Sequence, residues 1–293
     1  MFKYLNNLAI KYCWGPILDF LFPRFCLGCG REGEWLCPSC REKILAVKTQ
    51  VCPACGRISP KGSYCASDRY FKEIQYIQGK RKEIKTRRSL GGIIVSAYYE
   101  EGPIKEAIHN FKYNNIVELK NILGDVLAAT LKENLDLAPK EEIMLTAVPL
   151  HFIRRAQRGY NQSELLADYV ATKLNLAKNF RILRKIRWTK PQVKLGGEKR
   201  LKNLENSFKI VTKITKIAKI NAALTAKFPR KFRSKNHKNR EKKMRPLKND
   251  ILFGKTIILV DDVATTGATL NECAKVLKKA GAKEVWGLVV AKG

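Results

Sequence analysis

Apolar residues recur along the chain in two patterns, which together predict a sheet whose strands are separated by helices. Short apolar runs, typical of strands buried on both faces, occupy residues 91–99, 144–148 and 257–260. Apolar residues at helical spacing fill the intervals, at residues 104–111, 116–137, 165–174 and 270–280. Strands that alternate with helices predict an α/β domain built on a parallel sheet flanked by helices.

The run at residues 257–260 leads into two adjacent carboxylates, Asp261 and Asp262. The residues that follow complete the candidate site: Ala264, Thr265, Thr266, Gly267, Ala268 and Thr269. Adjacent carboxylates accept hydrogen bonds from two neighbouring ribose hydroxyls, and small residues at a helix N-terminus present N–H groups to a phosphate. Because ligands of parallel sheets bind beyond the strand carboxyl ends, this segment predicts a ribose-5-phosphate site. The alternative is an ordinary turn in which these residues only cap the helix.

A second candidate anion site follows the middle strand pattern. Arg154 and Arg158, with a third arginine and a glycine beside them, stand between this strand and the next helix pattern. The carboxyl ends of parallel strands share one edge, so we expect these guanidinium groups on the same edge as the two carboxylates. Ser163 is expected to cap the helix. Further along, the polar segment that contains Arg200 is expected to fold over a ligand.

Seven of the nine cysteines fall between Cys26 and Cys65, and most of them form C-x-x-C pairs. The candidate metal ligands are Cys26, Cys29, Cys37, Cys40, Cys52, Cys55, Cys65 and Asp68. Two such pairs can point four thiolates at one tetrahedral metal, so we expect one or two structural zinc ions. A disulfide framework is the competing interpretation, but the cluster has an odd number of cysteines and no secretory signal is recognisable.

Two features of these ligands stay open at the level of sequence. Asp68 stands where a fourth C-x-x-C pair would have its last cysteine, so the second site is either three thiolates with Asp68 or empty. The pairing order is either sequential or interleaved, with Cys26 and Cys29 sharing a metal with Cys52 and Cys55.

The charge of the chain is strongly positive, with 57 Lys and Arg against 26 Asp and Glu in 293 residues. A formal charge of +31 favours polyanionic partners, although a Lys-rich coding bias would raise it without any binding site. The excess is dense in residues 210–250, which we expect either to bind single-stranded DNA or to be a solvated insertion.

Residues 1–22 are apolar in places but interrupted by charges, which indicates an amphipathic segment instead of a signal peptide or a transmembrane span. A membrane-surface anchor is the alternative for this segment. The cytoplasm is therefore the expected compartment, with no integral membrane segment.

Three motifs, together with the cysteine pairs, resemble the ComF family of competence-associated phosphoribosyltransferase homologues. They are V-P-L-H-x-x-R-x-x-x-R-G-Y-N-Q, then Q-x-x-L-x-x-x-x-R-x-x-N-x-x-x-x-F, then V-D-D-V-x-T-T-G-x-T. The resemblance covers nearly the whole chain and implies a type I phosphoribosyltransferase fold after a double zinc ribbon. It implies a phosphoribosyl pyrophosphate (PRPP) ligand with Mg²⁺, and Arg154, Arg158 and Arg200 are candidates for its pyrophosphate side. It also implies a link to DNA uptake in natural competence, with a DNA-uptake helicase as a candidate partner.

The expected organisation is an amphipathic segment at 1–22, a zinc module at 23–71, a linker, and a phosphoribosyltransferase-like domain at 90–293. The basic insertion 210–250 is longer than the connection usual in the family. Two functions fit this organisation. One is an enzyme that transfers phosphoribose from PRPP to an acceptor that the sequence does not identify. The other is a non-catalytic protein that binds single-stranded DNA or acts as an adaptor and keeps the fold.

Overall fold

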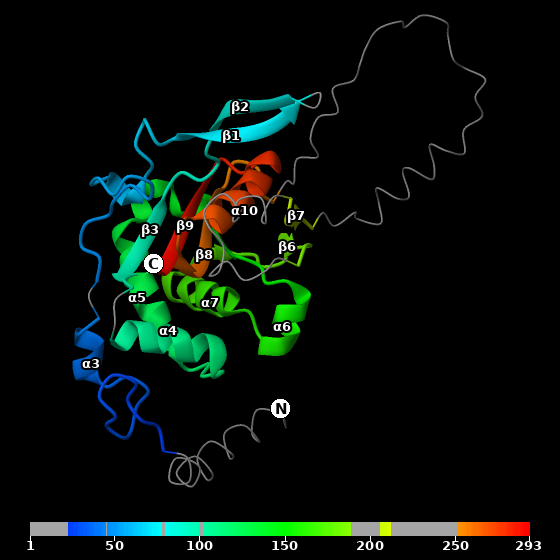
Figure 1. Cartoon of the computed structure of the whole chain (residues 1–293). Helices are drawn as coiled ribbons and strands as arrows, with labels where there is room; N and C mark the ends of the chain where they lie inside the picture. The colour runs from blue at the N-terminus through cyan, green and yellow to red at the C-terminus, as the bar shows by residue number, and fades with distance from the viewer. Residues whose placement is uncertain (1–22, 45, 78–79, 100–101, 189–205, 212–250) are drawn as a thin grey trace, which may run out of the picture.

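A computed structural model describes residues 23–44, 46–77, 80–99, 102–188, 206–211 and 251–293, with only the backbone described within 72–85. The amphipathic segment 1–22, Arg200 and all of the basic insertion beyond residue 211 lie outside these residues. Figure 1 shows the chain from the cysteine-rich segment, in blue, to the last strand, in red.

The centre of the protein is a five-stranded sheet in which every neighbouring pair is parallel. Its strands in spatial order are β3 (Ile93–Tyr98), β9 (Glu284–Lys292), β8 (Thr256–Ala264), β4 (Ile143–Ala147) and β5 (Ala177–Lys178). The register places Ile258 of β8 beside Leu145 of β4 and Trp286 of β9. The expected parallel α/β sheet is therefore confirmed, and the carboxyl ends of β4 and β8 lie at one edge.

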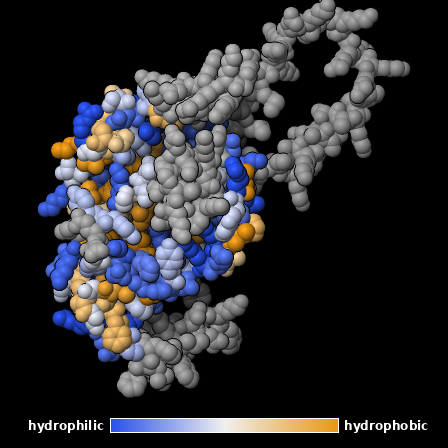
Figure 2. Space-filling view, viewed as in Figure 1, coloured by the Kyte–Doolittle hydropathy of each residue, from blue (hydrophilic) through white to orange (hydrophobic). Residues whose placement is uncertain are grey.

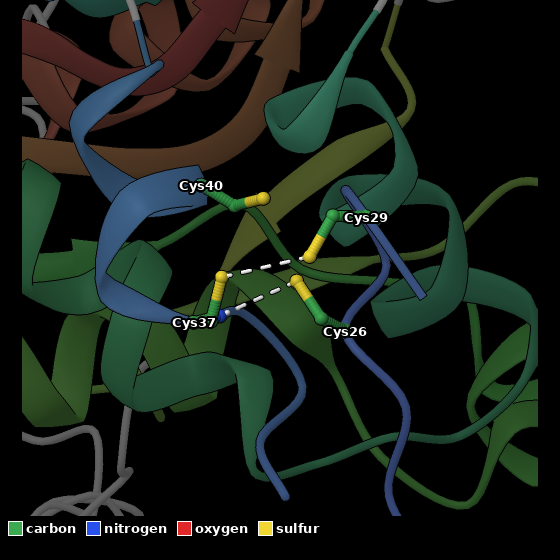
Figure 3. Close-up of side chains that lie close together, drawn as sticks. All are labelled: Cys26, Cys29, Cys37 and Cys40. Atoms are coloured by element: carbon green, nitrogen blue, oxygen red, sulfur yellow. Dashed lines mark hydrogen bonds between the residues drawn. The ribbon is translucent and has the colours of Figure 1, made fainter. Parts of the chain in front are cut away.

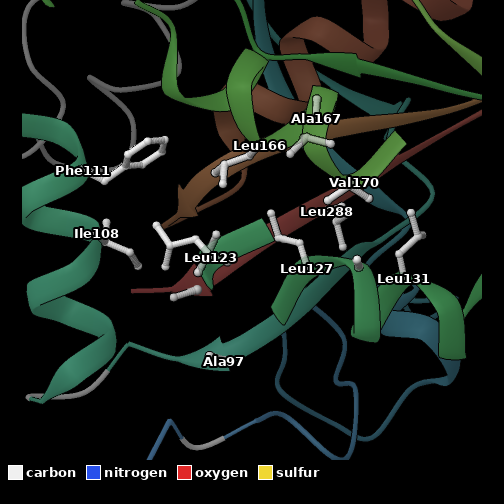
Figure 4. Close-up of a cluster of buried hydrophobic side chains, with 14 of the residues drawn as sticks. Ala97, Ile108, Phe111, Leu123, Leu127, Leu131, Leu166, Ala167, Val170 and Leu288 are labelled. Atoms are coloured by element: carbon white, nitrogen blue, oxygen red, sulfur yellow. The ribbon is translucent and has the colours of Figure 1, made fainter. Parts of the chain in front are cut away.

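Helices cover both faces of the sheet, which explains why its strands are continuous apolar runs. On one face α4 (Pro103–Tyr113), α5 (Leu119–Glu133) and α7 (Gln162–Leu174) pack together, and α10 (Ala268–Lys279) packs on the other. Successive residues of β8 pack on opposite faces of the sheet. Ile258 lies in the apolar cluster with α4, α5 and α7, and Ile257 lies in the cluster with α10. Figure 4 shows side chains of α4, α5 and α7 meeting in the first cluster.

The cysteine-rich segment lies along the free edge of β3. It contains the short helix α3 (Pro38–Glu42) and the 3-10 helix η1 (Pro60–Gly62). Isolated bridges join Ala46 to Ala97 and Ser63 to Gly92, so two stretches of this segment pair with the β3 edge. Leu36 is fully buried and belongs to the same apolar cluster as α4 and α5. The segment therefore covers an edge that would otherwise be open to pairing with another chain.

The segment expected to be a linker, after residue 71, is mostly an antiparallel hairpin. Its strands β1 (Tyr70–Ile77) and β2 (Lys80–Arg87) pair from Tyr70 with Arg87 to Ile77 with Lys80. The linker prediction was wrong, because a high density of charged residues does not exclude a strand: edge strands commonly carry lysine and other charged residues. Figure 1 shows this hairpin above α10 and the end of the sheet.

Other elements begin or end at residues different from those that the sequence predicted. The long helix expected at 116–137 ends at Glu133 and is followed by two 3-10 helices, η2 (Leu135–Leu137) and η3 (Lys140–Glu142). The arginine-rich segment expected as a loop contains a short helix, α6 (Phe152–Arg158). Near it, β6 (Leu183–Lys185) and β7 (Phe208–Ile210) pair antiparallel outside the main sheet.

Candidate functional site

Asp261 and Asp262 lie near the carboxyl end of β8, which continues beyond them as far as Ala264. The two neighbouring residues differ in exposure, because Asp262 is buried and Asp261 is partly exposed. The adjacent strand β4 ends beside them, where the N–H of Val148 donates to the carbonyl of Val260 at 3.0 Å. The carboxylates therefore lie at the edge that the sequence predicted, although within the strand instead of after it.

Each of the two carboxylates is held through a single oxygen. Asp261 Oδ1 accepts from the hydroxyl of Ser163 at 2.8 Å and from the N–H of Asp262 at 3.0 Å. Asp262 Oδ1 accepts from the N–H of Val263 at 2.6 Å and from Lys112 Nζ at 3.0 Å. Among the residues that the structure describes, neither Oδ2 atom accepts a hydrogen bond. Each carboxylate thus keeps one oxygen for a ligand.

Lys112, at the C-terminal end of α4, is a site residue that the sequence analysis did not identify. Burial lowers the pKa of Lys112, but the carboxylates of Asp262 and Asp261 outweigh burial and hold it above its ordinary value. Burial and the charge of Asp262 raise the pKa of Asp261 to about 7, against the opposing effects of Ser163 and Lys112. The two negative charges are therefore expensive to keep together, and the ammonium group partly offsets that cost.

Ser163 has a different role from the one expected. The residue at the N-cap position of α7 is Asn161, and Ser163 donates its hydroxyl to Asp261 instead of capping the helix. Asn161 donates from Nδ2 to the carbonyl of Val148 at 3.0 Å. The start of α7 is thus tied to the ends of both β4 and β8.

Between β8 and α10 lies a short loop with a left-handed residue, Gly267, at φ 71°. A Cβ atom on Gly267 would lie 2.7 Å from Ile93 Cδ1, so the position requires glycine for space as well as for conformation. The N–H of Ala268 approaches Thr266 Oγ1 at 3.4 Å as the helix begins. The hydroxyl-bearing residues of the predicted loop all keep solvent exposure: Thr265, Thr266 and Thr269.

Arg154 and Arg158 lie on α6, close to the same edge. The guanidinium of Arg154 lies 5.3 Å from the centre of the Trp188 ring, and that of Arg158 lies 5.2 Å from the centre of the Tyr113 ring. Burial, and then the charge of Arg158, lower the pKa of Arg154. The helix therefore presents two neighbouring cations that repel each other, an arrangement that favours an anion between or beside them. The third candidate, Arg200, lies outside the described residues.

The first two cysteine pairs form one candidate metal centre. Cys26, Cys29, Cys37 and Cys40 bring their sulfur atoms within 4.8 Å of one another, and Figure 3 shows three of the four converging, with Cys40 nearby. The Sγ atoms of Cys29 and Cys37 lie 3.7 Å apart, and the N–H of Cys37 donates to Cys26 Sγ at 3.3 Å. Four thiolates in this arrangement match a structural zinc site.

The remaining ligands form a second candidate centre, so the pairing order is sequential. Cys52, Cys55, Cys65 and Asp68 also lie within 4.8 Å of one another. Cys52 Sγ lies 3.5 Å from Asp68 Oδ2, and Cys55 Sγ lies 3.7 Å from Cys65 Sγ. The carboxylate of Asp68 therefore takes the place that the sequence left open, as a fourth candidate ligand.

Local geometry at the first centre fits a bound zinc ion. Burial raises the pKa of Cys26, but N–H groups of Cys37, Gly28 and Cys29 outweigh it and lower the pKa to about 6, which favours the thiolate that zinc requires. A Cβ atom on Gly28 would lie 2.7 Å from Cys40 Sγ, so this turn closes tightly on the sulfur atoms. When bound, zinc would tie α3 to the turn at Gly28.

In the part of the chain that the structure describes, no helix combines the length and the apolar character needed to cross a membrane.

Two family models match separate parts of the chain. A model of the double zinc ribbon domain matches residues 17–67, and a model of the phosphoribosyl transferase domain matches residues 193–292. The first range includes both cysteine centres apart from Asp68, and the second includes Asp261 and Asp262.

Several proteins are similar to this chain over most of its length. Competence protein F of Haemophilus influenzae is 28% identical over 261 residues, which cover 87% of this chain and 96% of that protein. Competence protein ComFC of Bacillus subtilis is 23% identical over 251 residues, covering 86% and 81%. DNA utilization protein YhgH of Escherichia coli K12 is 24% identical over 264 residues, covering 87% and 91%.

Two solved structures show weaker likeness. A phosphoribosylpyrophosphate synthetase from Mycobacterium smegmatis is 15% identical with a TM-score of 0.27, and the match covers 58% of this chain and 33% of that one. TT1426 from Thermus thermophilus is 18% identical with a TM-score of 0.29, covering 59% and 81%.

The sheet, the two cysteine centres and the family matches define a protein of the phosphoribosyltransferase fold class that carries an N-terminal double zinc ribbon. The relatives named for competence match most of the chain, across both of these parts. These relatives and the two domain matches support a protein of the ComF family.

Proposed function

We propose that the carboxyl edge of β8 and β4 binds PRPP together with Mg²⁺. The observation that supports this most is the free Oδ2 atom on both Asp261 and Asp262, among the described residues, while each Oδ1 atom is held by the protein. Two adjacent ribose hydroxyls match this pair, because each can donate one hydrogen bond to a carboxylate oxygen.

The 5′-phosphate of the ligand belongs in the loop ahead of α10. Ala264 ends β8, Thr265, Thr266 and Gly267 form the loop, and Ala268 and Thr269 are the first residues of the 12-residue helix α10. Helix N-termini carry unpaired N–H groups and a partial positive charge, which favour a phosphate. Gly267 supplies the left-handed turn, at φ 71°, that leads from the strand into this helix.

The pyrophosphate group belongs on the side of α6. Arg154 and Arg158 lie on one helix and are oriented by aromatic rings, so their guanidinium groups are partly preorganised. Arg200 is a further candidate from the sequence. When bound, Mg²⁺ would spread the negative charge of the pyrophosphate.

Transfer of phosphoribose is the reaction that such a site supports, with cleavage of the bond between the ribose C1 and pyrophosphate and formation of a bond to the acceptor. The acceptor stays unassigned, and no general base stands out among the described residues near Asp261. The alternative is that the site binds PRPP or a related ligand without turnover.

The assignment of the 5′-phosphate to the loop before α10 and of the pyrophosphate to α6 can be tested with fragments of PRPP. Each fragment is titrated into the protein in a calorimeter with Mg²⁺ present. Thr266→Val should weaken the binding of ribose 5-phosphate and PRPP but not that of pyrophosphate. Arg158→Gln should weaken the binding of pyrophosphate and PRPP but not that of ribose 5-phosphate. Thr172→Val on α7 and Arg184→Gln on β6 are matched controls, because both side chains are exposed and outside the site. Equal losses for all three ligands in both site variants would contradict the assignment.

A role in handling DNA during uptake is the second part of the proposal. It is supported by relatives named for competence and DNA utilization, and by the charge of +31. Near Arg154 and Arg158, Tyr113, Phe152 and Trp188 are 60%, 71% and 48% exposed, and exposed aromatic rings beside cations suit stacked bases. In Figure 2 the visible described surface is mostly hydrophilic with scattered apolar patches.

Salt dependence tests this second part. Deleting residues 212–248 removes a dense block of positive charge and should lower the salt slope of single-stranded DNA binding by roughly 0.7 for each phosphate that the block neutralises. PRPP affinity should change little. An unchanged slope would mean that the block does not touch DNA. A helicase partner stays a prediction of the family resemblance.

A further inference from the structure

A cavity of about 310 Å³ lies where the base of the β1–β2 hairpin meets the start of β9. Its charged and aromatic lining residues are Arg69, Arg87, Arg88, Lys278, Glu284 and Trp286. Glu284 is the first residue of β9, whereas Asp261 of β8 pairs with Val289 further along that strand. The cavity is therefore at the amino edge of the sheet, opposite the candidate PRPP site.

Backbone pairing at the base of the hairpin gathers three guanidinium groups. The N–H of Arg88 donates to the carbonyl of Arg69 at 2.8 Å, and Arg87 pairs with Tyr70 one step along. Neighbouring like charges on paired strands destabilise each other. An anion bound among them would remove that cost.

The cavity has a net positive lining, because four cationic side chains and one carboxylate line it. The carboxylate of Glu284 already accepts a hydrogen bond from Trp286 Nε1 at 2.9 Å. Lys278, near the C-terminal end of α10, adds the fourth cation from a different element. Three separate parts of the chain thus contribute positive charge to one cavity.

One of these cations has a fixed orientation. Arg88 donates through Nε to the carbonyl of Asp68 at 2.9 Å, and its guanidinium lies 4.7 Å from the Tyr64 ring centre and 5.1 Å from the Phe71 ring centre. A guanidinium held in this way is preorganised for two-point binding of a phosphate. The same contact places the cavity directly beside the second cysteine centre.

The floor of the cavity is apolar. Leu90 and Val285 are buried, and Gly91 brings its backbone so close to Trp286 that a Cβ atom there would lie 3.1 Å from the ring. Cations around an apolar floor suit a ligand that has one anionic group and an apolar or planar part. The volume is at the lower end of the roughly 300–1,000 Å³ found for small-molecule sites.

We propose that this cavity binds the phosphate of a nucleotide, as a second anion site separate from the PRPP site. The shared chemistry is a phosphate attached to a nucleoside. Its source is either a free nucleoside monophosphate or a phosphate of a nucleic acid strand.

Titration of the full zinc-loaded protein, followed by NMR, tests this site. The indole N–H resonance of Trp286, assigned with Trp286→Phe, reports on the cavity because this group contacts Glu284 within it. A nucleoside 5′-monophosphate should shift that resonance, and Arg69→Gln with Arg87→Gln should weaken its affinity at least tenfold. Arg69→Lys with Arg87→Lys should retain most of the affinity, which separates loss of charge from misfolding.

The matched control is Arg184→Gln with Lys209→Gln, which removes two charges from a cross-strand pair on β6 and β7. The affinity of this control variant for the nucleoside 5′-monophosphate should change less than twofold. The site should also survive Asp261→Asn with Asp262→Asn, because it is independent of the proposed PRPP site. The proposal would be overturned if millimolar nucleotide caused no shift of the Trp286 resonance. It would also be overturned if nucleotide affinity fell equally in the Arg69→Gln, Arg87→Gln variant and in the control, or if it fell in the Asp261→Asn, Asp262→Asn variant.

Two further ligands distinguish the source of the phosphate. An oligothymidylate that shifts the same resonance at lower concentration than the monophosphate would identify a nucleic acid strand. A shift with the monophosphate alone would identify a free nucleotide. Either result supports the cavity as a phosphate site, whereas an equal shift with inorganic sulfate would show non-selective anion binding and contradict it.

Discussion

Gly267 offers a test of how the candidate phosphate loop is built. Gly267→Ala introduces a side chain at φ 71° and places its Cβ 2.7 Å from Ile93 Cδ1 in the buried cluster beneath. The left-handed conformation costs an L-residue about 1–2 kcal/mol. Forcing a methyl group into a packed core costs about 1–3 kcal/mol more. We therefore expect a total loss of about 2–5 kcal/mol in the free energy of unfolding.

Gly254 is the matched control, because its φ is 74° but a Cβ atom there meets nothing within 4 Å. Gly254→Ala should show the conformational cost alone, and urea unfolding of both variants measures the difference. Ile93→Val removes Cδ1 and should recover part of the stability lost in Gly267→Ala, although alone it costs about 0.5–1.5 kcal/mol. Equal losses for the two glycines, or additive losses with Ile93→Val, would refute the steric account.

Three further predictions concern the metal centre and the charges around β8. Asp68→Ala should lower the zinc content from two to one per chain by elemental analysis, and Asp68→Cys should keep two; unchanged content in Asp68→Ala would show that the carboxylate is not a ligand. Because the folded pKa of Asp261 is raised to about 7 from 3.8, the folded state binds more protons between those values, so the free energy of unfolding should fall with rising pH by at most about 1.4 kcal/mol per unit. Asp261→Asn should remove that slope in chemical denaturation, and an unchanged slope would contradict the assignment. Lys112→Met leaves two carboxylates without their ammonium group. It should lower the free energy of unfolding by somewhat less than the loss of about 3–5 kcal/mol expected when one partner of a fully buried ion pair is removed. Lys61→Met, whose partner Asp136 is exposed, should lower it by less than about 1 kcal/mol. Equal costs for the two lysine variants in urea unfolding would contradict the role of Lys112.

The sequence was most informative where the packing environment is uniform. The run before Asp261 is buried on both faces by α7 and α10, so an unbroken apolar pattern was enough to predict β8. The end of the strand was misplaced because pairing with β9 continues through Ala264, and that pairing depends on a partner strand which local composition does not reveal.

Contacts between distant segments account for what the sequence did not reveal. Lys112 lies 150 residues before Asp262, and only the packing of α4 over the sheet edge brings them together. Serine is a common capping residue, which favours a cap at Ser163, but its hydroxyl donates to the carboxylate of Asp261 on β8. The sequential pairing of the cysteines likewise depends on where the chain docks along β3, which spacing leaves undetermined.

Titration of PRPP into the double variant Asp261→Asn with Asp262→Asn, with Mg²⁺ present, tests the proposed binding site most directly. The amides keep the shape of the carboxylates but lose both negative charges, and charge-assisted hydrogen bonds are worth about 1.5–3 kcal/mol each. The affinity should therefore fall at least tenfold. Asp125→Asn with Asp168→Asn, on α5 and α7, should leave the PRPP affinity unchanged, because these side chains are 47% and 55% exposed and their partners among the described residues are Lys173, Lys178 and Tyr169. Wild-type affinity in the Asp261 and Asp262 variant would contradict the proposed site.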